Sequence, residues 1–512
     1  MNRTKHWLLT AVLIPALLSL FGWAGASAQV QDPNWSEPYR LSSLYGEASG
    51  AAMLSDSFGF VHVFWSESGF DHLRSLIYYA VYDGESWSTP ADIYASWPGV
   101  GIHDLSASVD EEGYLHLVWS EGAVGPLMYS KAEIGNASSA RSWQEPIRID
   151  VPATKVEVAV DEAGVIHIVY MHVESQQIQA LHRQAQDGQP GIYYYFSENQ
   201  GRAWTYPTWL DPDIPAGAVL NWLDMTVDEK DGIHLVWAYR DEETSGSLAG
   251  WVRYSHSLNG GETWSEPFSV DFADEGVGEL RLAHPGIVVS GEEVHLVWSG
   301  NSMTEREHRF SLDRGLTWSE TELIFDGLEG QAIGDGLAID GLGRVHFAGQ
   351  IRWPMAIYHA VWESGSWSEP SMVYLIRQGT NDELAGRIHA HNVRLAVHNG
   401  NQLVMTFTTE PTSQQLVLYA MQAVLDEVPE SVPSALPAAE VMEAAALPIP
   451  GPTDQAEPTA APGGGGSEVF SGGEVVAEPS PIRALWIGVV PSLILATSIV
   501  AFRILRSRGS FR

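Results

Sequence analysis

The fold is decided by the stretch Ser311-Leu312-Asp313-Arg314-Gly315-Leu316-Thr317-Trp318. The Asp313 side chain can accept hydrogen bonds from backbone N–H groups that follow it, and Gly315 supplies a position of positive φ. Trp318 then begins a strand and brings a large apolar surface with it. The stretch therefore predicts a hairpin turn that is fixed by packing of the Trp318 side chain.

The turn recurs in two further copies. Residues 257–264 read SLNGGETW, and residues 197–204 read SENQGRAW. The pattern resembles the Asp-box, S-x-D-x-G-x-T-W, of the sialidase or BNR-repeat superfamily. The resemblance covers about residues 35 to 425 and implies a β-propeller in which the box is a structural turn, away from the catalytic face. The structural box residues are Ser257, Asn259, Gly261, Trp264, Ser311, Asp313, Gly315 and Trp318.

The composition supports an all-β chain. Of its 512 residues 45% are hydrophobic, with 20 Trp, 28 Pro and 49 Gly, which suits a large core with many turns. The formal net charge of -37 argues against nucleic acid as a partner, because like charges repel. The chain has no cysteine, so stability comes from packing without disulfides, which for a secreted domain favours a bacterial source.

Both ends carry targeting signals. Residues 1–28 have a basic start, an apolar run and a small-residue site at Ala26-Ser27-Ala28, which predicts a signal peptide; an uncleaved anchor is the alternative. Residues 483–503 are apolar enough and long enough to form a transmembrane helix. The basic residues 504–512 follow, and the positive-inside rule places this tail in the cytoplasm and the propeller outside the cell membrane.

Two patterns recur with a period of roughly 50 to 60 residues, which indicates a propeller over residues 29–425. One is an apolar strand with an inserted histidine, and the other is a Trp usually followed by Pro, which belongs on an outer strand. Both predict seven blades, with six as the alternative. The histidines are His62, His116, His167, His234, His295 and His346, and the tryptophans are Trp35, Trp87, Trp143, Trp204, Trp264, Trp318 and Trp367.

The ring is expected to close through the N-terminal strand. The first Trp strand, at residues 35–41, precedes any complete unit, whereas the last unit has no Trp strand. Adding the first strand to the last blade removes the open sheet edges. Residues 426–482, rich in Ala, Pro, Glu and Gly, predict a disordered spacer that spans on the order of 40 Å.

The repeated histidines are predicted to be structural, because equivalent residues of six blades cannot all supply one catalytic base. Function is expected in the loops that break the repeat around the central channel. Arginines there are candidates for anion recognition, although they can instead pair with the excess acids. The candidate ligand-binding residues are His103, Asp104, Arg240, Arg281, Arg352, Asp382, Arg387, His389 and His391.

The catalytic residues stay unassigned. Sialidases use three arginines, a Tyr nucleophile assisted by Glu, and an Asp acid, with the first Arg in an F-R-I-P box. The nearest string here is Pro38-Tyr39-Arg40-Leu41, but Arg40 lies in the predicted outer strand. His389 and His391 could bind a metal only if their strand projected both to one side. No cofactor or metal site is predicted.

Three functions follow for a membrane-anchored extracellular propeller. We expect a recognition module for a glycan or a surface protein. The alternative is an exo-acting, sialidase-like glycoside hydrolase, which needs two carboxylates or a Tyr/Glu pair beside an arginine cluster in the central pocket. The third is a structural component of a surface layer, without a pocket. These three functions are distinguished by whether arginines and acids from separate blades converge.

Overall fold

The computed structural model describes residues 33–436 apart from several internal segments. The predicted signal peptide, transmembrane helix and tail, and residues 437–482 of the predicted spacer, lie outside the described residues. Within the described part, no helix is long and apolar enough to cross a membrane. The internal segments not described are 44–45, 69–73, 123–124, 173–190, 215–217, 242–248, 273–283, 300–305, 326–327, 329–335, 353–354, 378–390 and 413–414.

The described chain forms antiparallel sheets and two short 3-10 helices, η1 (Ile134–Asn136) and η2 (Ala140–Ser142). The strands of the first two sheets are β3 (Ala48–Ser55), β4 (Val61–Ser68), β5 (Ser75–Tyr82) and β6 (Ala91–Ala95), then β7 (Ile102–Val109), β8 (Tyr114–Glu121), β9 (Gly125–Glu133), β10 (Ile147–Val160), β11 (Ile166–His172), β12 (Gly191–Ser197) and β13 (Thr208–Trp209).

The next three sheets follow in chain order. Their strands are β14 (Val219–Val227), β15 (Ile233–Asp241), β16 (Ala249–Ser257) and β17 (Phe268–Phe272); β18 (Gly286–Ser290), β19 (Glu293–Ser299), β20 (Arg306–Ser311) and β21 (Glu322–Leu323); and β22 (Gly336–Ile339), β23 (Val345–Arg352), β24 (Met355–Glu363), β25 (Ser366–Trp367) and β26 (Ser371–Arg377).

The last sheet joins the two ends of the propeller. It contains β27 (His391–His398), β28 (Gln402–Thr412) and β29 (Gln415–Val424), and both β1 (Asn34–Trp35) and β2 (Tyr39–Arg40) pair with β29. The N-terminal segment therefore completes the last sheet, as its tryptophan pattern predicts.

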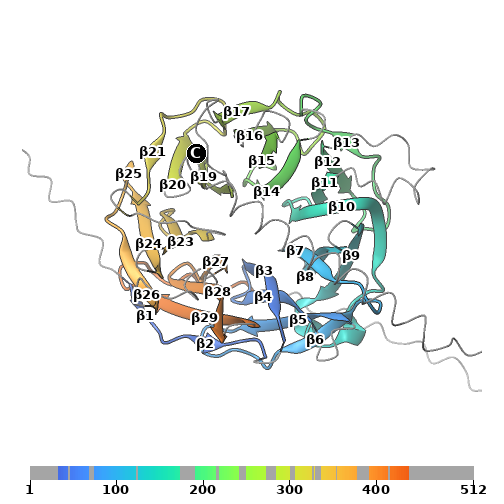
Figure 1. The fold of residues 1–512 in the computed structure, drawn as a ribbon, viewed down its shortest axis with the longest axis horizontal. Coiled ribbons are helices and arrows are strands. Elements are labelled where there is room, and N and C mark those ends of the chain that lie inside the picture. The colour runs from blue at the N-terminus through green and yellow to red at the C-terminus, as the bar shows by residue number, and fades with distance from the viewer. Residues whose placement is uncertain are drawn as a thin grey trace, which may run out of the picture. The chain divides into compact units, whose positions relative to one another are not determined.

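The sheets are arranged around a centre (Figure 1). The first strand of each repeat contacts the next in the order β3, β7, β10, β14, β18, β22 and β27, and β27 contacts β3 again. Outer strands such as β6 and β17 lie at the rim (Figure 1). The prediction of an all-β propeller is confirmed.

The number of separate sheets differs from the predicted seven. The hydrogen bonds of the described residues form six sheets, one of which has seven strands. The reason is the 14-residue strand β10, whose first half pairs with β9 and whose second half pairs with β11. The chain thus passes from the rim to the centre without a break between the outer strand of one repeat and the inner strand of the next.

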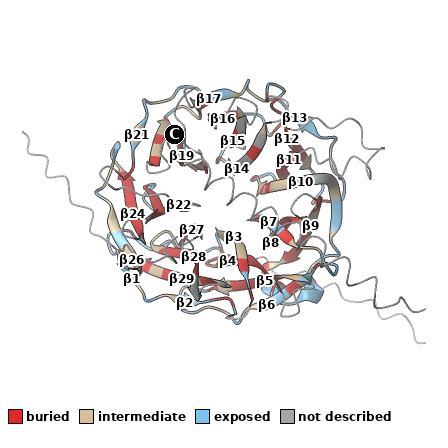
Figure 2. Cartoon of the chain, in the orientation of Figure 1, coloured by how far each residue is buried: buried red, intermediate tan, exposed pale blue. Residues whose placement is uncertain are grey.

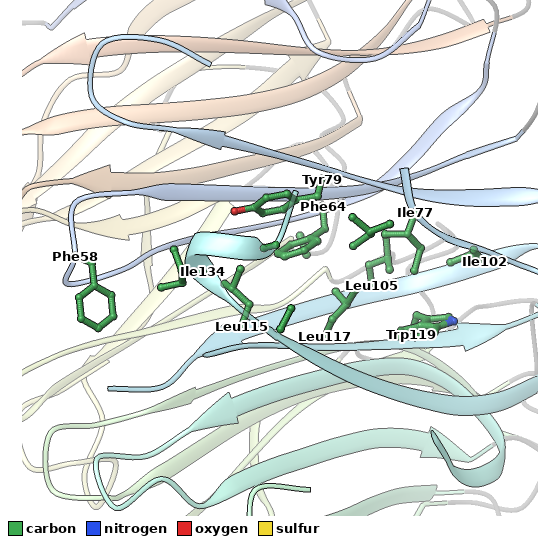
Figure 3. Packing of buried hydrophobic residues seen from close by; sticks show 14 residues of the cluster. Phe58, Phe64, Ile77, Tyr79, Ile102, Leu105, Leu115, Leu117, Trp119 and Ile134 are labelled. Atoms are coloured by element: carbon green, nitrogen blue, oxygen red, sulfur yellow. The ribbon is translucent and has the colours of Figure 1, made fainter. Parts of the chain in front are cut away.

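The core lies between neighbouring sheets. The second strands, such as β4 and β8, are almost wholly buried, whereas β6 at the rim is mostly accessible (Figure 2). Figure 3 shows one such interface, in which Phe64, Ile77 and Tyr79 of one sheet lie against Leu117 and Trp119 of the next. Apolar faces on both sides of a strand explain why the His strands read as nearly continuous hydrophobic runs.

The strand histidines are structural, as predicted. His234 is fully buried; its Nδ1 lies 2.7 Å from the Tyr254 hydroxyl and its Nε2 lies 3.1 Å from the Asp228 carboxylate. The same Asp–His–Tyr network recurs because a buried imidazole needs partners for both nitrogens. The other networks are Asp56–His62–Tyr79, Asp110–His116–Tyr129 and Asp161–His167–Tyr194.

The Asp-box of residues 311–318 fastens its sheet to the preceding one. Ser311 Oγ accepts the Gly315 N–H at 2.8 Å, and the Trp318 ring stands edge-on to the Tyr254 ring at 4.9 Å. Tyr254 belongs to the preceding sheet, so the turn connects directly to the buried histidine network there. The copy at Trp264 makes the same edge contact with Tyr194 at 5.0 Å.

Two histidine pairs depart from this network, because His308 and His359 stand where four other repeats have Tyr. His308 Nε2 lies 3.1 Å from His295 Nδ1, and His359 Nε2 lies 2.9 Å from His346 Nδ1. Burial lowers the pKa of His295 to about 3, with His308 adding to the shift, and burial lowers the pKa of His308 as well. Both rings are therefore neutral in the folded protein at neutral pH.

The His295–His308 pair predicts that the stability of the propeller is sensitive to acid. The unfolded chain takes up protons on these rings near pH 6.5, whereas the folded protein does not. The free energy of unfolding is therefore at its full value above about pH 6.5 and decreases as pH falls. We expect His308→Tyr to reduce the fall in stability between pH 7 and 5 by up to about 1.4 kcal/mol per pH unit. Thermal unfolding at several pH values measures it, and identical slopes would contradict the explanation.

The residues after β29 lie on the propeller. Leu425 and Val428 are buried in the core of the last sheet, and the following residues cross to neighbouring sheets. Residues 426–436, at the start of the predicted spacer, thus form a strap over the hairpins that join first and second strands. Its bonds are Glu427 Oε1 to Arg344 Nη2 at 2.9 Å, Ser431 N to Asn399 O at 2.8 Å, and Ser434 N to Ser57 O at 2.8 Å.

Candidate functional site

The inner strands carry one equivalent position that faces the centre of the ring. In several sheets it pairs with the fourth residue of the His strand, as in Ser106 with Val118, Glu157 with Val169 and Asp224 with Val236. A cavity of about 250 Å³ is lined by this position in every repeat. The residues at this strand position are, in chain order, Ala52, Ser106, Glu157, Asp224, Gly286, Gly336 and Arg394. Three charged side chains therefore interrupt a ring of small residues.

Glu157 is held beside a serine of the preceding repeat. The Ser106 hydroxyl donates to Glu157 Oε2 at 2.6 Å and accepts the Val158 N–H at 3.1 Å. The Glu157 side chain is partly buried and lines the cavity. Burial raises the pKa of Glu157 to about 8, and the charge of Asp224 adds to the rise. Glu157 is therefore mostly protonated at pH 7.

Asp224 is held by backbone donors. Its Oδ2 accepts the N–H of Ile287 in the next repeat at 2.9 Å, and its Oδ1 accepts the Met225 N–H at 2.9 Å. Burial raises the pKa of Asp224 to about 6, although the Ile287 N–H and the nearby Arg394 oppose the rise. Asp224 is therefore mostly ionised at pH 7, so the two carboxyl groups differ in protonation.

Arg394 supplies the positive charge among these three. Its Nη1 donates to the Val393 carbonyl at 3.3 Å, and it makes no ion pair with another described residue. Its charge lowers the pKa of both Glu157 and Asp224. The remaining guanidinium donors can serve a carboxylate or hydroxyl of a ligand.

Residues with positive φ precede the cavity position in several repeats, and one of them, His284, lines the cavity. Asp104, Lys155, His284 and Asn392 all have positive φ, between 36° and 53°, two residues before the cavity position of their strands. Such conformations are costly for residues other than glycine and gather at functional sites. Asp104 Oδ1 and Lys155 Nζ form an ion pair at 2.6 Å, and Lys155 Nζ also lies 4.5 Å from the centre of the Trp222 ring.

His284 is buried and neutral. Burial lowers the pKa of His284 to about 3, and the cations Arg306, Lys155 and Arg394 contribute. The ring is edge-on to Trp222 at 4.1 Å, and neither ring nitrogen has a hydrogen-bond partner among the described residues. A neutral imidazole can both donate and accept, so it is suited to a hydroxyl group.

The structure places five of the nine predicted site residues at one end of the sheets and describes few of their side chains. His103 is exposed on β7, and Asp104 contacts Lys155. Arg240, Arg352 and His391 lie at the ends of β15 and β23 and at the start of β27, where their side chains are not described. The candidates outside the described residues are Arg281, Asp382, Arg387 and His389.

Sequence reasoning missed the three charged residues that face the cavity. Their signal is a charge between two apolar residues in the first strand of a repeat, as in residues 156–158 (VEV), 223–225 (LDM) and 393–395 (VRL). Alignment of the repeats on these strands would show Ala, Ser or Gly elsewhere. In the described part of the chain, no group of three His, Asp or Glu side chains is placed to bind a metal.

No protein-family model matches the sequence, and no curated protein matches it either. Among solved structures, an ulvan lyase of a new polysaccharide lyase family has 12% identity, covers 77% of this chain and 95% of its own, and gives a TM-score of 0.48. The Hadza microbial sialidase has 12% identity, covers 69% of this chain and 74% of its own, and gives a TM-score of 0.43. The NanB sialidase of Streptococcus pneumoniae has 13% identity, covers 79% of this chain and 72% of its own, and gives a TM-score of 0.39. Sialidases are thus among the structures similar to this chain, but similarity at this level decides no activity.

Proposed function

We propose that the propeller recognises a carbohydrate in its central cavity. The observation that supports this is the set Glu157, Asp224 and Arg394, which comes from separate repeats and faces one cavity. Protonated and ionised carboxyl groups together with a guanidinium offer donors and acceptors for hydroxyl groups, and Trp222 adds an aromatic surface. At about 250 Å³ the cavity suits a sugar unit better than a protein surface.

The wider arrangement is part of the proposal. The seven-stranded sheet counts as two blades that share β10, which gives seven blades. Residues 1–28 direct secretion, residues 437–482 form a spacer, and residues 483–503 anchor the chain with residues 504–512 in the cytoplasm. The propeller then meets glycans outside the cell.

A glycoside hydrolase is the second candidate. The carboxyl part of the criterion stated for it favours this candidate, since Glu157 and Asp224 line the central cavity; among the described lining residues, Arg394 stands in place of the arginine cluster. Binding of a glycan array by the ectodomain, together with turnover of fluorogenic glycosides including sialosides, tests both candidates. Absence of binding to any glycan would reject the recognition function.

Arg394 gives a direct test of the binding site. Loss of a hydrogen bond to a charged group costs about 1.5 to 3 kcal/mol, so we expect Arg394→Met to weaken binding of an arrayed glycan about 10- to 150-fold. Titration calorimetry measures the change. Arg148→Met is the control, because Arg148 is exposed on the outer part of β10. Equal affinity of the Arg394→Met variant and the wild type would exclude Arg394 from the site.

A further inference from the structure

The two carboxyl groups in the cavity come from consecutive repeats. Glu157 lies on the second half of β10 and Asp224 on β14, and these strands are in contact. The two groups interact, because the charge of Asp224 raises the pKa of Glu157. Among the described residues, no tyrosine lines the cavity. The described chemistry of this cavity is therefore that of paired carboxyl groups.

We propose that Glu157 and Asp224 form an acid–base pair that hydrolyses a glycosidic bond in the central cavity, with Glu157 as the proton donor and Asp224 as the base. This inference rests on the proposed carbohydrate-binding function. It assigns the chemistry to inner-strand residues instead of the loop residues that the sequence suggested.

The step is balanced without a cofactor. The Glu157 carboxylic acid transfers its proton to the glycosidic oxygen while the bond from that oxygen to the anomeric carbon breaks. A water oxygen forms the new bond to the anomeric carbon, and the proton that it loses goes to the Asp224 carboxylate. The products are a free sugar and an alcohol. Transfer of a proton from Asp224 to Glu157, directly or through water, restores the starting state.

A purely structural role does not explain these residues. Asp224 accepts the Ile287 N–H of the next repeat, but Ser106 does the same for the Val158 N–H with a neutral hydroxyl. Ala52, Gly286 and Gly336 fill the position with no polar side chain at all. Since a buried charge is costly and small residues suffice for the fold, two carboxyl groups here indicate a function.

The protonation states agree with the assigned roles. The pKa of Glu157, raised to about 8 by burial and Asp224, keeps its proton at pH 7, and the pKa of Asp224, raised to about 6 by burial, leaves it ionised. Pairs whose environments separate their pKa values are typical of acid–base catalysis. We expect activity to fall below about pH 6 as Asp224 becomes protonated, and above about pH 8 as Glu157 loses its proton.

The location of the proton can be measured without a substrate. Infrared difference spectra of the ectodomain at pH 7 should show a protonated carboxyl stretch that is lost in Glu157→Gln and kept in Asp224→Asn. Glu145→Gln serves as the control, because Glu145 is exposed. A protonated carboxyl band that survives in Glu157→Gln would overturn the assignment of the acid.

Turnover tests the reaction itself. With a panel of 4-methylumbelliferyl glycosides that includes sialosides, uronides and neutral sugars, we expect the wild type to cleave at least one member. Loss of a general acid or base reduces the rate about 100- to 10,000-fold, so Glu157→Gln and Asp224→Asn should both lose activity to this extent. Asp224→Ser should lose it too, although it keeps an acceptor for the Ile287 N–H.

The outcomes separate the two proposals. Calorimetric binding of a sugar by Glu157→Gln without turnover supports the acid–base pair. Sugar binding by a wild type that cleaves no panel member overturns the pair and leaves the recognition function intact. Full activity in Asp224→Ser reduces Asp224 to a structural acceptor and overturns its role as base. If the wild type neither binds nor cleaves any sugar, both proposals are rejected.

Discussion

Replacing Gly315 by alanine should destabilise the propeller by about 2 to 5 kcal/mol. Gly315 has φ of 85°, and an added Cβ would lie 1.9 Å from the Tyr254 hydroxyl oxygen. The positive φ costs an alanine about 1 to 2 kcal/mol, and the forced displacement of a packed side chain costs about 1 to 3 kcal/mol more. Tyr254 cannot move freely, because its hydroxyl is 2.7 Å from His234 Nδ1. Urea and thermal unfolding of the ectodomain measure the loss.

Gly365→Ala separates the two causes. Gly365 has the same φ of 85°, but no atom lies within 4 Å of its added Cβ. Its substitution should therefore cost only the backbone share, about 1 to 2 kcal/mol. If both variants lost the same stability, contact between the Asp-box and the preceding sheet would not be what fixes this turn.

Asp228→Ala should cost about 3 to 5 kcal/mol, since it leaves buried partners unpaired. The Asp228 carboxylate accepts His234 Nε2 at 3.1 Å, and Arg314 of the following Asp-box binds it through Nε at 2.7 Å and Nη2 at 2.9 Å. One residue thus joins the histidine network of its own sheet to the turn of the next. Chemical unfolding of the variant measures this contribution.

The matched variant is Asp161→Ala, which removes the same kind of network without an arginine. Asp161 accepts His167 Nε2 at 3.2 Å and the Val165 N–H at 2.7 Å. We expect it to cost less than Asp228→Ala by about 1.5 to 3 kcal/mol, the contribution of bonds to a charged group. Equal losses would show that Arg314 adds nothing to the junction.

Asp228 also gives a pH dependence. Burial alone would raise its pKa, but hydrogen bonds from His234 and Arg314 outweigh burial and lower the pKa below the ordinary value. A lowered pKa stabilises the fold above the unfolded value of about 4, and this contribution is lost as pH falls below it. The wild type should therefore lose more stability than Asp228→Ala between pH 4 and 2, which thermal unfolding detects.

Much of the fold could be predicted from the sequence, because a propeller repeats its constraints. The V-H-x-V-W strands had to be buried on both faces, and the Asp-box had to be a turn. Both are local patterns that recur, so each copy supports the others. The sheet count differed because nothing local marks the continuity of β10, which depends on hydrogen bonds that its two halves make to different partners.

The site could not be predicted in the same way. Glu157, Asp224 and Arg394 are more than 60 residues apart in sequence, and only closure of the ring brings their strands around one cavity. The raised pKa values of Glu157 and Asp224 arise from burial by several repeats, which no single stretch encodes. Polar loop residues were predicted to form the site because loops commonly carry function. A charged residue within an inner strand only interrupts the apolar pattern and gives no local signal of function.

The strap of residues 426–436, together with Leu425 before it, decides how the ring bears a mechanical load. A pull on the chain beyond residue 436 reaches the Ser434 bond first, then Ser431, and then Glu427 with Val428 and Leu425. These contacts break one after another, and their release lengthens the chain by up to about 40 Å at roughly 3.4 Å per residue. Only then does tension reach β29, which β28 holds on one side and β1 and β2 hold on the other.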